Sequence, residues 1–275
     1  MSRLHTVCWL VVALGMSLLA AGSFAQTTQP EGFQPQVGQP GKDVVWVPTQ
    51  QDLVEKMLDM AKVTPKDYVI DLGSGDGRTV ITAAKRGARA HGIEYNPDMV
   101  ELSIRNAAQA GVSDKATFTK ADLFESDFSK ATVLTLFLLP DINIRLRPKI
   151  LDMKPGTRVV SNSFTMEDWD SDEKITLETG CSTWCTAYLW IVPAKVDGKW
   201  RLPQGEVTFQ QKFQQITGTL VSGGKSTPVA GKLTGDQIHF TAGEAAYSGQ
   251  VNGASISGTV KSGSSSTPWQ ATRQN

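Results

Sequence analysis

A glycine-rich turn between an apolar run and a helical pattern constrains the fold of this 275-residue chain more than any other feature. The apolar run at 68–71 predicts a buried strand, and the turn after it contains Gly73, Gly75 and Gly77. The pattern at 78–86 then predicts a helix. A strand, a glycine turn and a helix in this order predict one unit of a parallel sheet, whose turn can approach a ligand closely.

Strand and helix patterns alternate along the whole of residues 43–201. Strand patterns lie at 68–71, 90–94, 116–120, 131–139, 157–164, 174–178 and 187–192, with helical patterns after the first, second and fourth of them. Alternation of this kind predicts an α/β domain, here a seven-stranded Rossmann-like sheet with helices on both faces. We expect the last two strands to form a hairpin at the edge of this sheet.

The composition changes in residues 203–275, which are rich in Gly, Ser and Thr and show no helical period. An internal repeat is visible, because Gly231, Gly235, Ile238 and Thr241 recur 18 residues later as Gly249, Gly253, Ile256 and Thr259. An 18-residue unit is about the length of a β-hairpin. We therefore expect a small antiparallel all-β domain, either a meander or a barrel.

Residues 1–25 have the pattern of a bacterial-type secretory signal, with a basic start, an apolar run and small residues before a cleavage point after Ala25. The alternative is an N-terminal membrane anchor, because the apolar run approaches the length of a membrane span. Residues 26–42 are rich in Pro and Gln and predict an extended, disordered linker. We expect a periplasmic or secreted protein with no stable membrane span after cleavage.

Cys181 and Cys185 are the two cysteines that follow this signal. In one straight strand their separation would be roughly 13 Å, so a disulfide between them requires a turn. A local disulfide and free thiols both stay open. We expect no metal site, because the two remaining histidines, His91 and His239, are distant in the sequence and zinc takes about four ligands.

The charge balance excludes some partners. The chain has 27 basic and 27 acidic side chains, so no long-range attraction to DNA, RNA or anionic lipid is expected. The oligomeric state is not indicated by any pattern.

Carboxylates near the glycine turn indicate the kind of ligand. Asp71 stands two residues before the first glycine, where it would repel a pyrophosphate and favour an ammonium group. Position 78 is Arg, so the G-x-G-x-x-G spacing of a dinucleotide site is missing. Glu94 and Asp122 follow at the ends of the next two predicted strands. Carboxyl ends of parallel strands meet at one edge of a sheet, so the three acids should surround one pocket.

Residues 71–77 resemble the cofactor loop of class I S-adenosylmethionine (SAM)-dependent methyltransferases. The resemblance implies SAM as cofactor, with Glu94 on the ribose hydroxyls and Asp122 with Leu123 at the adenine edge. The cofactor-binding residues that it implies are Asp71, Gly73, Ser74, Gly75, Gly77, Glu94, Asp122 and Leu123.

A narrower resemblance covers about 43–170. The segments WVPT at 46–49, VIDLGSGDGR at 69–78, LLP at 138–140 and KPGTRVVS at 154–161 are similar to a family of small methyltransferases. This family includes the lysine methyltransferases of the ATP synthase c-subunit and the adenine nucleotide translocase, with bacterial relatives. The resemblance implies a methyl acceptor that is a protein lysine amine or a small molecule. It also implies substrate-side candidates, Trp46, Pro48, Leu139 and Pro140, and a weak candidate for the catalytic base, Asp141.

Two other functions stay open. An exported binding protein could keep the methyltransferase fold and sense SAM or a nucleoside without turnover. Alternatively, the β domain is the functional part and the α/β domain is its scaffold.

Overall fold

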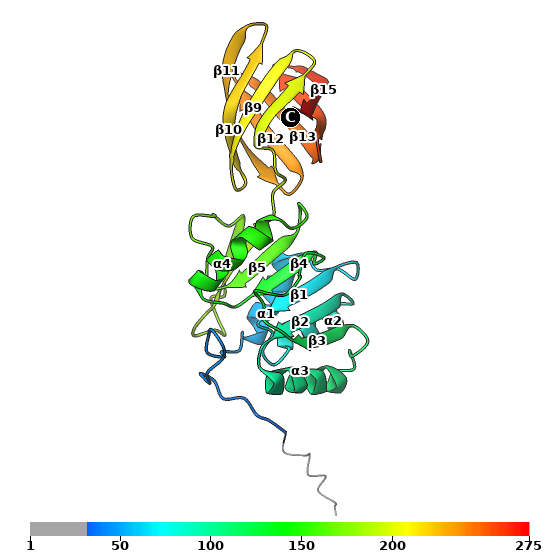
Figure 1. Ribbon diagram of the computed structural model, residues 1–275, viewed down its shortest axis with the longest axis vertical. Coiled ribbons are helices and arrows are strands. Elements are labelled where there is room, and N and C mark those ends of the chain that lie inside the picture. The colour runs from blue at the N-terminus through cyan, green and yellow to red at the C-terminus, as the bar shows by residue number, and fades with distance from the viewer. Residues whose placement is uncertain (1–31, 275) are drawn as a thin grey trace, which may run out of the picture. The chain divides into compact units, whose positions relative to one another are not determined.

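The computed structural model describes residues 32–274, which contain a seven-stranded sheet with helices and a closed barrel (Figure 1). The sheet consists of β1 (Tyr68–Leu72), β2 (Arg89–Glu94), β3 (Ala116–Lys120), β4 (Val133–Leu136), β5 (Arg158–Asn162), β6 (Glu173–Thr176) and β7 (Thr186–Ile191). Their order is β3-β2-β1-β4-β5-β7-β6. The first five strands are parallel, whereas β7 is antiparallel to both β5 and β6. The seven-stranded sheet and the edge hairpin are therefore confirmed.

Four helices accompany the sheet, namely α1 (Gln51–Met60), α2 (Arg78–Lys85), α3 (Pro97–Gln109) and α4 (Pro140–Leu151). Side chains of α1, α2 and α3 join one apolar core with Val69 of β1, while side chains of α4 join a second core with Ile70. Neighbouring residues of a strand point to opposite faces. The two cores therefore lie on the two faces of the sheet, as the alternating pattern predicts.

The start of α1 differs from the sequence pattern. The Thr-x-x-Asp spacing at 49–52 resembles a capping box, but the N-cap residue is Gln50, whose side chain makes no capping hydrogen bond. The hydroxyl of Thr49 instead accepts a hydrogen bond from the buried amide of Asn162, at 3.1 Å. A tertiary contact with the end of β5 therefore replaces the local cap.

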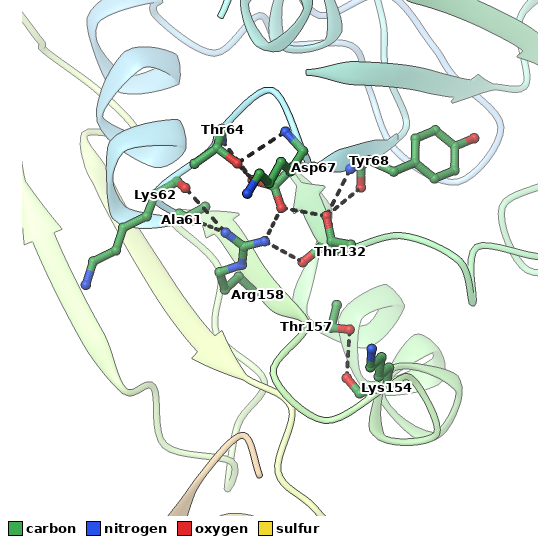
Figure 2. A network of polar contacts seen from close by, with 10 residues as sticks. Ala61, Lys62, Thr64, Asp67, Tyr68, Thr132, Lys154, Thr157 and Arg158 are labelled. Carbon is green, nitrogen blue, oxygen red and sulfur yellow. Dashed lines mark hydrogen bonds and ion pairs between the residues drawn. The ribbon is translucent and has the colours of Figure 1, made fainter. Parts of the chain in front are cut away.

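A polar network lies at the amino ends of the strands (Figure 2). Arg158, the first residue of β5, forms an ion pair with Asp67, which immediately precedes β1. The guanidinium also donates to the carbonyl of Ala61 at 2.7 Å, and Thr132 donates to Asp67 at 2.8 Å. The network thus joins the segment after α1 to three neighbouring strands, at the edge opposite to the glycine turn.

The barrel consists of β8 (Gly198–Leu202), β9 (Gly205–Lys212), β10 (Gln215–Ser222), β11 (Lys225–Thr234), β12 (Gln237–Ala242), β13 (Ala245–Asn252), β14 (Ser255–Ser262) and β15 (Ser265–Arg273). Neighbouring strands are antiparallel, and β15 pairs with β8 to close it. Rings of Phe240 and Tyr247 stack inside with centroids 4.5 Å apart, and Trp269 packs edge-on against both. The all-β domain is therefore a closed barrel, and its first strand lies before residue 203.

The 18-residue repeat corresponds to two successive hairpins of the barrel, β11 with β12 and β13 with β14. Its glycines have two different roles. Gly235 and Gly253 lie in the turns with φ of 60° and 57°, where side chains are rarely accommodated. Gly231 lies inside a strand where an added Cβ would be 2.1 Å from the carbonyl oxygen of His239.

Cys181 and Cys185 form a disulfide in the connection between β6 and β7, with Cα atoms 5.7 Å apart. The predicted signal and the first residues of the predicted linker lie outside the described residues. Within 32–274, none of the helices is both long enough and apolar enough to cross a membrane.

Candidate active site

A cavity lies at the carboxyl edge of the parallel strands. Its wall includes residues that follow β1, β2, β3 and β4, together with the segment 39–49 that precedes α1. Six of the eight predicted cofactor residues line it, whereas Gly75 and Gly77 do not; the six are Asp71, Gly73, Ser74, Glu94, Asp122 and Leu123. The parallel topology therefore brings the acids of three successive strands to one pocket, as expected.

The glycine turn packs closely against neighbouring segments. Gly73, Gly75 and Gly77 have φ of 77°, 54° and 82°, a region that side chains rarely adopt. A Cβ at Gly75 would lie 2.6 Å from the indole nitrogen of Trp46, so the two segments pack too closely for any other residue. Ser74 lines the cavity, and its buried Oγ has no hydrogen-bond partner among the described residues. This Oγ lies against Gly92 of β2, where an added Cβ would be 2.5 Å from it.

Asp71 is a buried carboxyl group at the end of β1. The hydroxyl of Thr135 donates to its Oδ1 at 2.6 Å. Burial is the main cause that raises the pKa of Asp71, and the neighbouring acids Glu94 and Asp76 add to it against the hydrogen bond from Thr135, so that the pKa is about 7. A ligand with an ammonium group would favour the ionised carboxylate, so this residue suits the amino group of SAM.

Glu94 connects the second strand to the glycine turn. One of its carboxylate oxygens accepts from the N–H of Gly75 at 2.9 Å, and the other accepts from the N–H of Asn96 at 2.9 Å. The carboxylate is half-buried and lines the cavity, with lone pairs left for ligand hydroxyls. It is thus fixed in the place where a ribose can donate to it.

Replacing Glu94 with Gln is expected to weaken SAM binding about 10- to 100-fold, which corresponds to ~1–3 kcal/mol for a charge-assisted hydrogen bond. Both oxygens of Glu94 accept from backbone N–H groups. The amide of Gln would therefore direct its NH₂ group toward one of these N–H groups, from which it cannot accept a hydrogen bond. Calorimetric titration of the purified protein with SAM measures the effect. The exposed Glu125, which does not line the cavity, gives the control Glu125→Gln. Equal affinity of Glu94→Gln and the unchanged protein would contradict this assignment.

Asp122 has a partner that the sequence patterns do not indicate. Its Oδ2 forms an ion pair with Lys42, while its Oδ1 accepts from the N–H of Phe124 at 2.9 Å. The hydrogen bond from Lys42 lowers the pKa of Asp122, and the same contact raises the pKa of Lys42. The ammonium of Lys42 also lies 5.0 Å from the ring centre of Tyr95. Lys42 therefore covers the end of the cavity where the resemblance places the adenine.

The segment 39–49 is a wall of the cavity and not only a connection. The N–H of Gly38 donates to the carbonyl of Trp46, and the N–H of Trp46 donates to the carbonyl of Gln39, at 2.9 and 3.0 Å. This hydrogen-bonded turn includes residues 39–42, which the Pro- and Gln-rich composition assigns to a linker. A lone lysine in such a stretch has no periodic signal that would reveal its role.

Of the four substrate-side candidates and the candidate base, the structure places three residues at the cavity and two outside it. Trp46, Pro48 and Leu139 line the cavity. Pro140 and Asp141 are in the first turn of α4 and are not among the lining residues, and Asp141 is exposed to solvent. Three aromatic side chains that the sequence patterns do not single out, Phe137, Phe164 and Trp184, also line the cavity.

Comparisons with known proteins agree with this geometry. Residues 71–173 match the family profile of the ANTKMT methyltransferase domain. The chain is 43% identical over 152 residues to a protein-lysine N-methyltransferase of Saccharolobus islandicus, covering 54% of this chain and 94% of the relative. It is 35% identical over 128 residues to the Mus musculus lysine N-methyltransferase of the ATP synthase c-subunit, covering 46% of this chain and 51% of that relative, so it spans about half the length of the mouse protein.

A solved structure also matches. It is an RNA methyltransferase from Salinibacter ruber in complex with S-adenosyl-L-homocysteine, with 46% identity and a TM-score of 0.52 over 55% of this chain and 96% of that chain. These findings confirm the predicted fold and cofactor. The chain therefore belongs to the family of SAM-dependent methyltransferases that contains the protein-lysine N-methyltransferase of Saccharolobus islandicus and the ANTKMT methyltransferase domain.

Proposed function

We propose that this methyltransferase acts on the side-chain amine of a protein lysine and that it is exported. The observation that carries the acceptor proposal is a set of apolar side chains in the lining of the cavity. These are Val47, Pro48, Met57, Phe137, Leu138, Leu139, Ile142, Phe164 and Trp184. The same lining also contains ionisable side chains, among them Asp71, Asp76, Arg78 and Glu94. Two relatives are named lysine N-methyltransferases, which agrees with an amine acceptor.

An apolar wall suits a lysine side chain in two ways. The four-carbon stem can pack against it, and removal from water favours the neutral amine over the ammonium. Neutral nitrogen is required because a lone pair must attack the methyl group, and a lysine in water is mostly protonated, with a pKa of about 10.4. Desolvation by this wall therefore favours release of the ammonium proton to water before the amine attacks the methyl group.

Bound SAM would supply a methyl group on a positively charged sulfur. The residues of this chain then have positioning roles. Asp71 would hold the amino group of SAM and Glu94 its ribose hydroxyls, while the N–H of Gly75 in the glycine turn keeps the Glu94 carboxylate in place. Leu138 and Leu139, which follow β4, contribute apolar side chains to the cavity wall; Leu138 is buried, whereas Leu139 is 40% exposed. Alignment and desolvation of two reactants are sufficient for a displacement of this kind.

The acceptor proposal is tested by transfer from methyl-labelled SAM to three defined acceptors: poly-L-lysine, poly-L-arginine and total RNA. We expect label in poly-L-lysine alone, recovered as methyllysine after hydrolysis, and none with Asp71→Asn. Label in RNA would replace the lysine proposal with an RNA acceptor, as the description of the Salinibacter ruber protein as an RNA methyltransferase suggests. Binding of SAM without transfer to any acceptor would support a sensor in place of an enzyme.

Export is supported by the signal pattern in residues 1–25 and by the Cys181–Cys185 disulfide, because disulfides persist in oxidising compartments. Expression of the full chain in a bacterium with an envelope tests it. We expect a periplasmic protein whose first residue is Gln26. A chain that keeps residues 1–25 in the membrane fraction would indicate the anchor, and a cytosolic chain would contradict export.

A further inference from the structure

Three aromatic rings form a cluster at the apolar end of the cavity. Phe137 follows β4, Phe164 follows β5 and Trp184 precedes β7. The ring centres of Phe164 and Trp184 are 5.1 Å apart. The ring centre of Phe137 lies 6.0 Å from that of Phe164 and 6.1 Å from that of Trp184. All three line the cavity that contains the glycine turn. We call Phe137, Phe164 and Trp184 the aromatic cluster.

The sheet topology explains why distant segments meet here. β4 and β5 are parallel neighbours, so the residues after them lie at the same edge. β7 runs antiparallel to β5, with Ala187 opposite Asn162, so the residues before β7 reach that edge as well. The acids at the ends of β1, β2 and β3 lie along the same edge but on the opposite side of β4 from β5 and β7 in the strand order. The cluster is therefore at the end of the cavity away from Asp122.

The loop before β7 holds Trp184 in an unusual conformation. Trp184 has a φ of 60°, which is rare for a bulky residue and strains the backbone. The disulfide between Cys181 and Cys185 closes the loop around it, and the N–H of Leu177 donates to the carbonyl of Cys185 at 2.9 Å. The Trp184 residue is still 44% exposed. A cross-linked, strained loop that presents an exposed tryptophan to a cavity indicates a binding role.

The faces of the cluster are free of cations from the described part of this chain. Lys42 lies over the ring of Tyr95, and Arg145 lies over the ring of Phe124 at 3.7 Å. Within residues 32–274, no such contact involves the three rings of the cluster. Aromatic faces attract ammonium groups, most strongly those of tryptophan. Because Trp184 is also exposed, a cation from a second molecule can reach its ring.

We infer that the aromatic cluster is the acceptor-recognition site and that Trp184 determines specificity for an ammonium-bearing side chain. The inference rests on the proposed lysine acceptor. The exposed indole of Trp184 first binds the lysine ammonium at the solvent side of the cavity. The lysine nitrogen then moves past Phe137 and Phe164, and the carbon stem packs against the apolar wall at Leu138 and Ile142. The disulfide keeps the indole in place while solvent surrounds its outer side.

The first test compares Trp184→Leu with Trp184→Tyr in labelled-methyl transfer to poly-L-lysine. Loss of a cation–π contact is expected to raise KM for poly-L-lysine by about tenfold in Trp184→Leu, while the dissociation constant of SAM stays within about twofold. Trp184→Tyr keeps an aromatic face and should restore most of the affinity. Ile104, an exposed apolar residue on α3, gives the control Ile104→Ala. An unchanged KM in Trp184→Leu, or the same increase in Trp184→Tyr, would overturn the inference.

A second test removes the disulfide. The double variant Cys181→Ser with Cys185→Ser should raise KM for poly-L-lysine in the same way as Trp184→Leu, and dithiothreitol should reproduce this increase in the unchanged protein but not in the double variant. SAM affinity should stay unchanged, because neither cysteine lines the cavity. If KM is the same with and without the bond, the loop does not depend on the disulfide and this part of the inference is wrong.

A third test does not depend on turnover, so it separates this inference from the proposed function. The indole N–H signal of Trp184, assigned in ¹⁵N-labelled protein by its absence in Trp184→Tyr, is followed in the presence of S-adenosyl-L-homocysteine. n-Butylammonium, which imitates a lysine side chain, should shift this signal, whereas n-butanol should not. A shift without methyl transfer to poly-L-lysine would contradict the proposed function and keep the ammonium site. Equal shifts with both probes, or none, would overturn the site even if poly-L-lysine is methylated.

Discussion

Replacing Asp71 with Asn is expected to stabilise the cofactor-free protein by about 4 kcal/mol at pH 8 and to remove SAM binding at the same time. Asp71 is 7% exposed, and its burial raises the pKa from an ordinary value of 3.8 to about 7. Ionisation of this group is therefore opposed by the folded state. An amide of the same shape has no charge to bury and can still bond to the hydroxyl of Thr135.

The pH dependence has a definite sign. Below about pH 4, Asp71 is protonated in the folded and the unfolded chain, and its full contribution to stability is present. As the pH rises to about 7, the unfolded chain loses this proton first, so the free energy of unfolding decreases and stays low above pH 7. Asp71→Asn lacks this decrease. The two proteins should therefore be equally stable near pH 4 and differ most at pH 8.

Urea unfolding at pH 4 and pH 8 measures the stability difference, and calorimetry with SAM at pH 8 measures binding. Asp114, an exposed acid in the connection before β3, gives the matched control Asp114→Asn. This control should change neither quantity. A stability gain that is the same at both pH values would show that burial of the charge is not its cause, and retained SAM affinity would show that Asp71 does not hold the ligand.

Replacing Arg158 with Met is expected to lower the free energy of unfolding by about 3–5 kcal/mol, the range found when one partner of a buried ion pair is removed. The side chain of Asp67 is 8% exposed and loses its main charged partner. Burial alone would raise the pKa of Asp67, but hydrogen bonds from Arg158, Thr64 and Thr132 outweigh it and hold the pKa below its usual range. These bonds stabilise the ionised form above the usual pKa, and their contribution is lost at acidic pH.

Chemical unfolding at pH 7 measures this effect, and a second substitution identifies its origin. Adding Asp67→Asn to Arg158→Met should recover part of the loss, because the unpaired charge is then absent. Lys195→Met is the control, since Lys195 and Asp152 form an exposed pair that contributes little. SAM affinity should be unchanged in folded Arg158→Met, because the network lies at the opposite edge of the sheet. A loss as small as that of Lys195→Met would contradict the assigned role.

Local patterns were sufficient to predict the parts of the fold that depend on local sequence. Tyr68–Leu72, the glycine turn and α2 are adjacent in the chain, and each has a period or composition of its own. The gathering of Asp71, Glu94 and Asp122 followed from one general rule, that the carboxyl ends of parallel strands share an edge. The 18-residue repeat predicted hairpins for the same reason, since a hairpin is a local structure.

Contacts between distant segments could not be predicted in this way. Lys42 contacts Asp122, which is 80 positions away in the sequence. The hydroxyl of Thr49 accepts a hydrogen bond from Asn162 and does not cap the helix that follows it. The position of Trp184 depends on the insertion of β7 between β5 and β6. The sequence motif C-S-T-W-C permits a turn, but it does not indicate which strand the turn precedes or what the indole contacts.

Closure of the barrel limits how the C-terminal domain can meet other molecules. β15 pairs with β8 only through Thr272 with Arg201 and Arg273 with Trp200, so within the described part of the chain residues 265–271 of β15 have no partner strand on that side. Every other pair of neighbouring strands in the barrel is matched over five residues or more. Association with the barrel by strand addition is therefore restricted to the seam between β15 and β8, and association elsewhere must use the hairpin turns or the outward side chains.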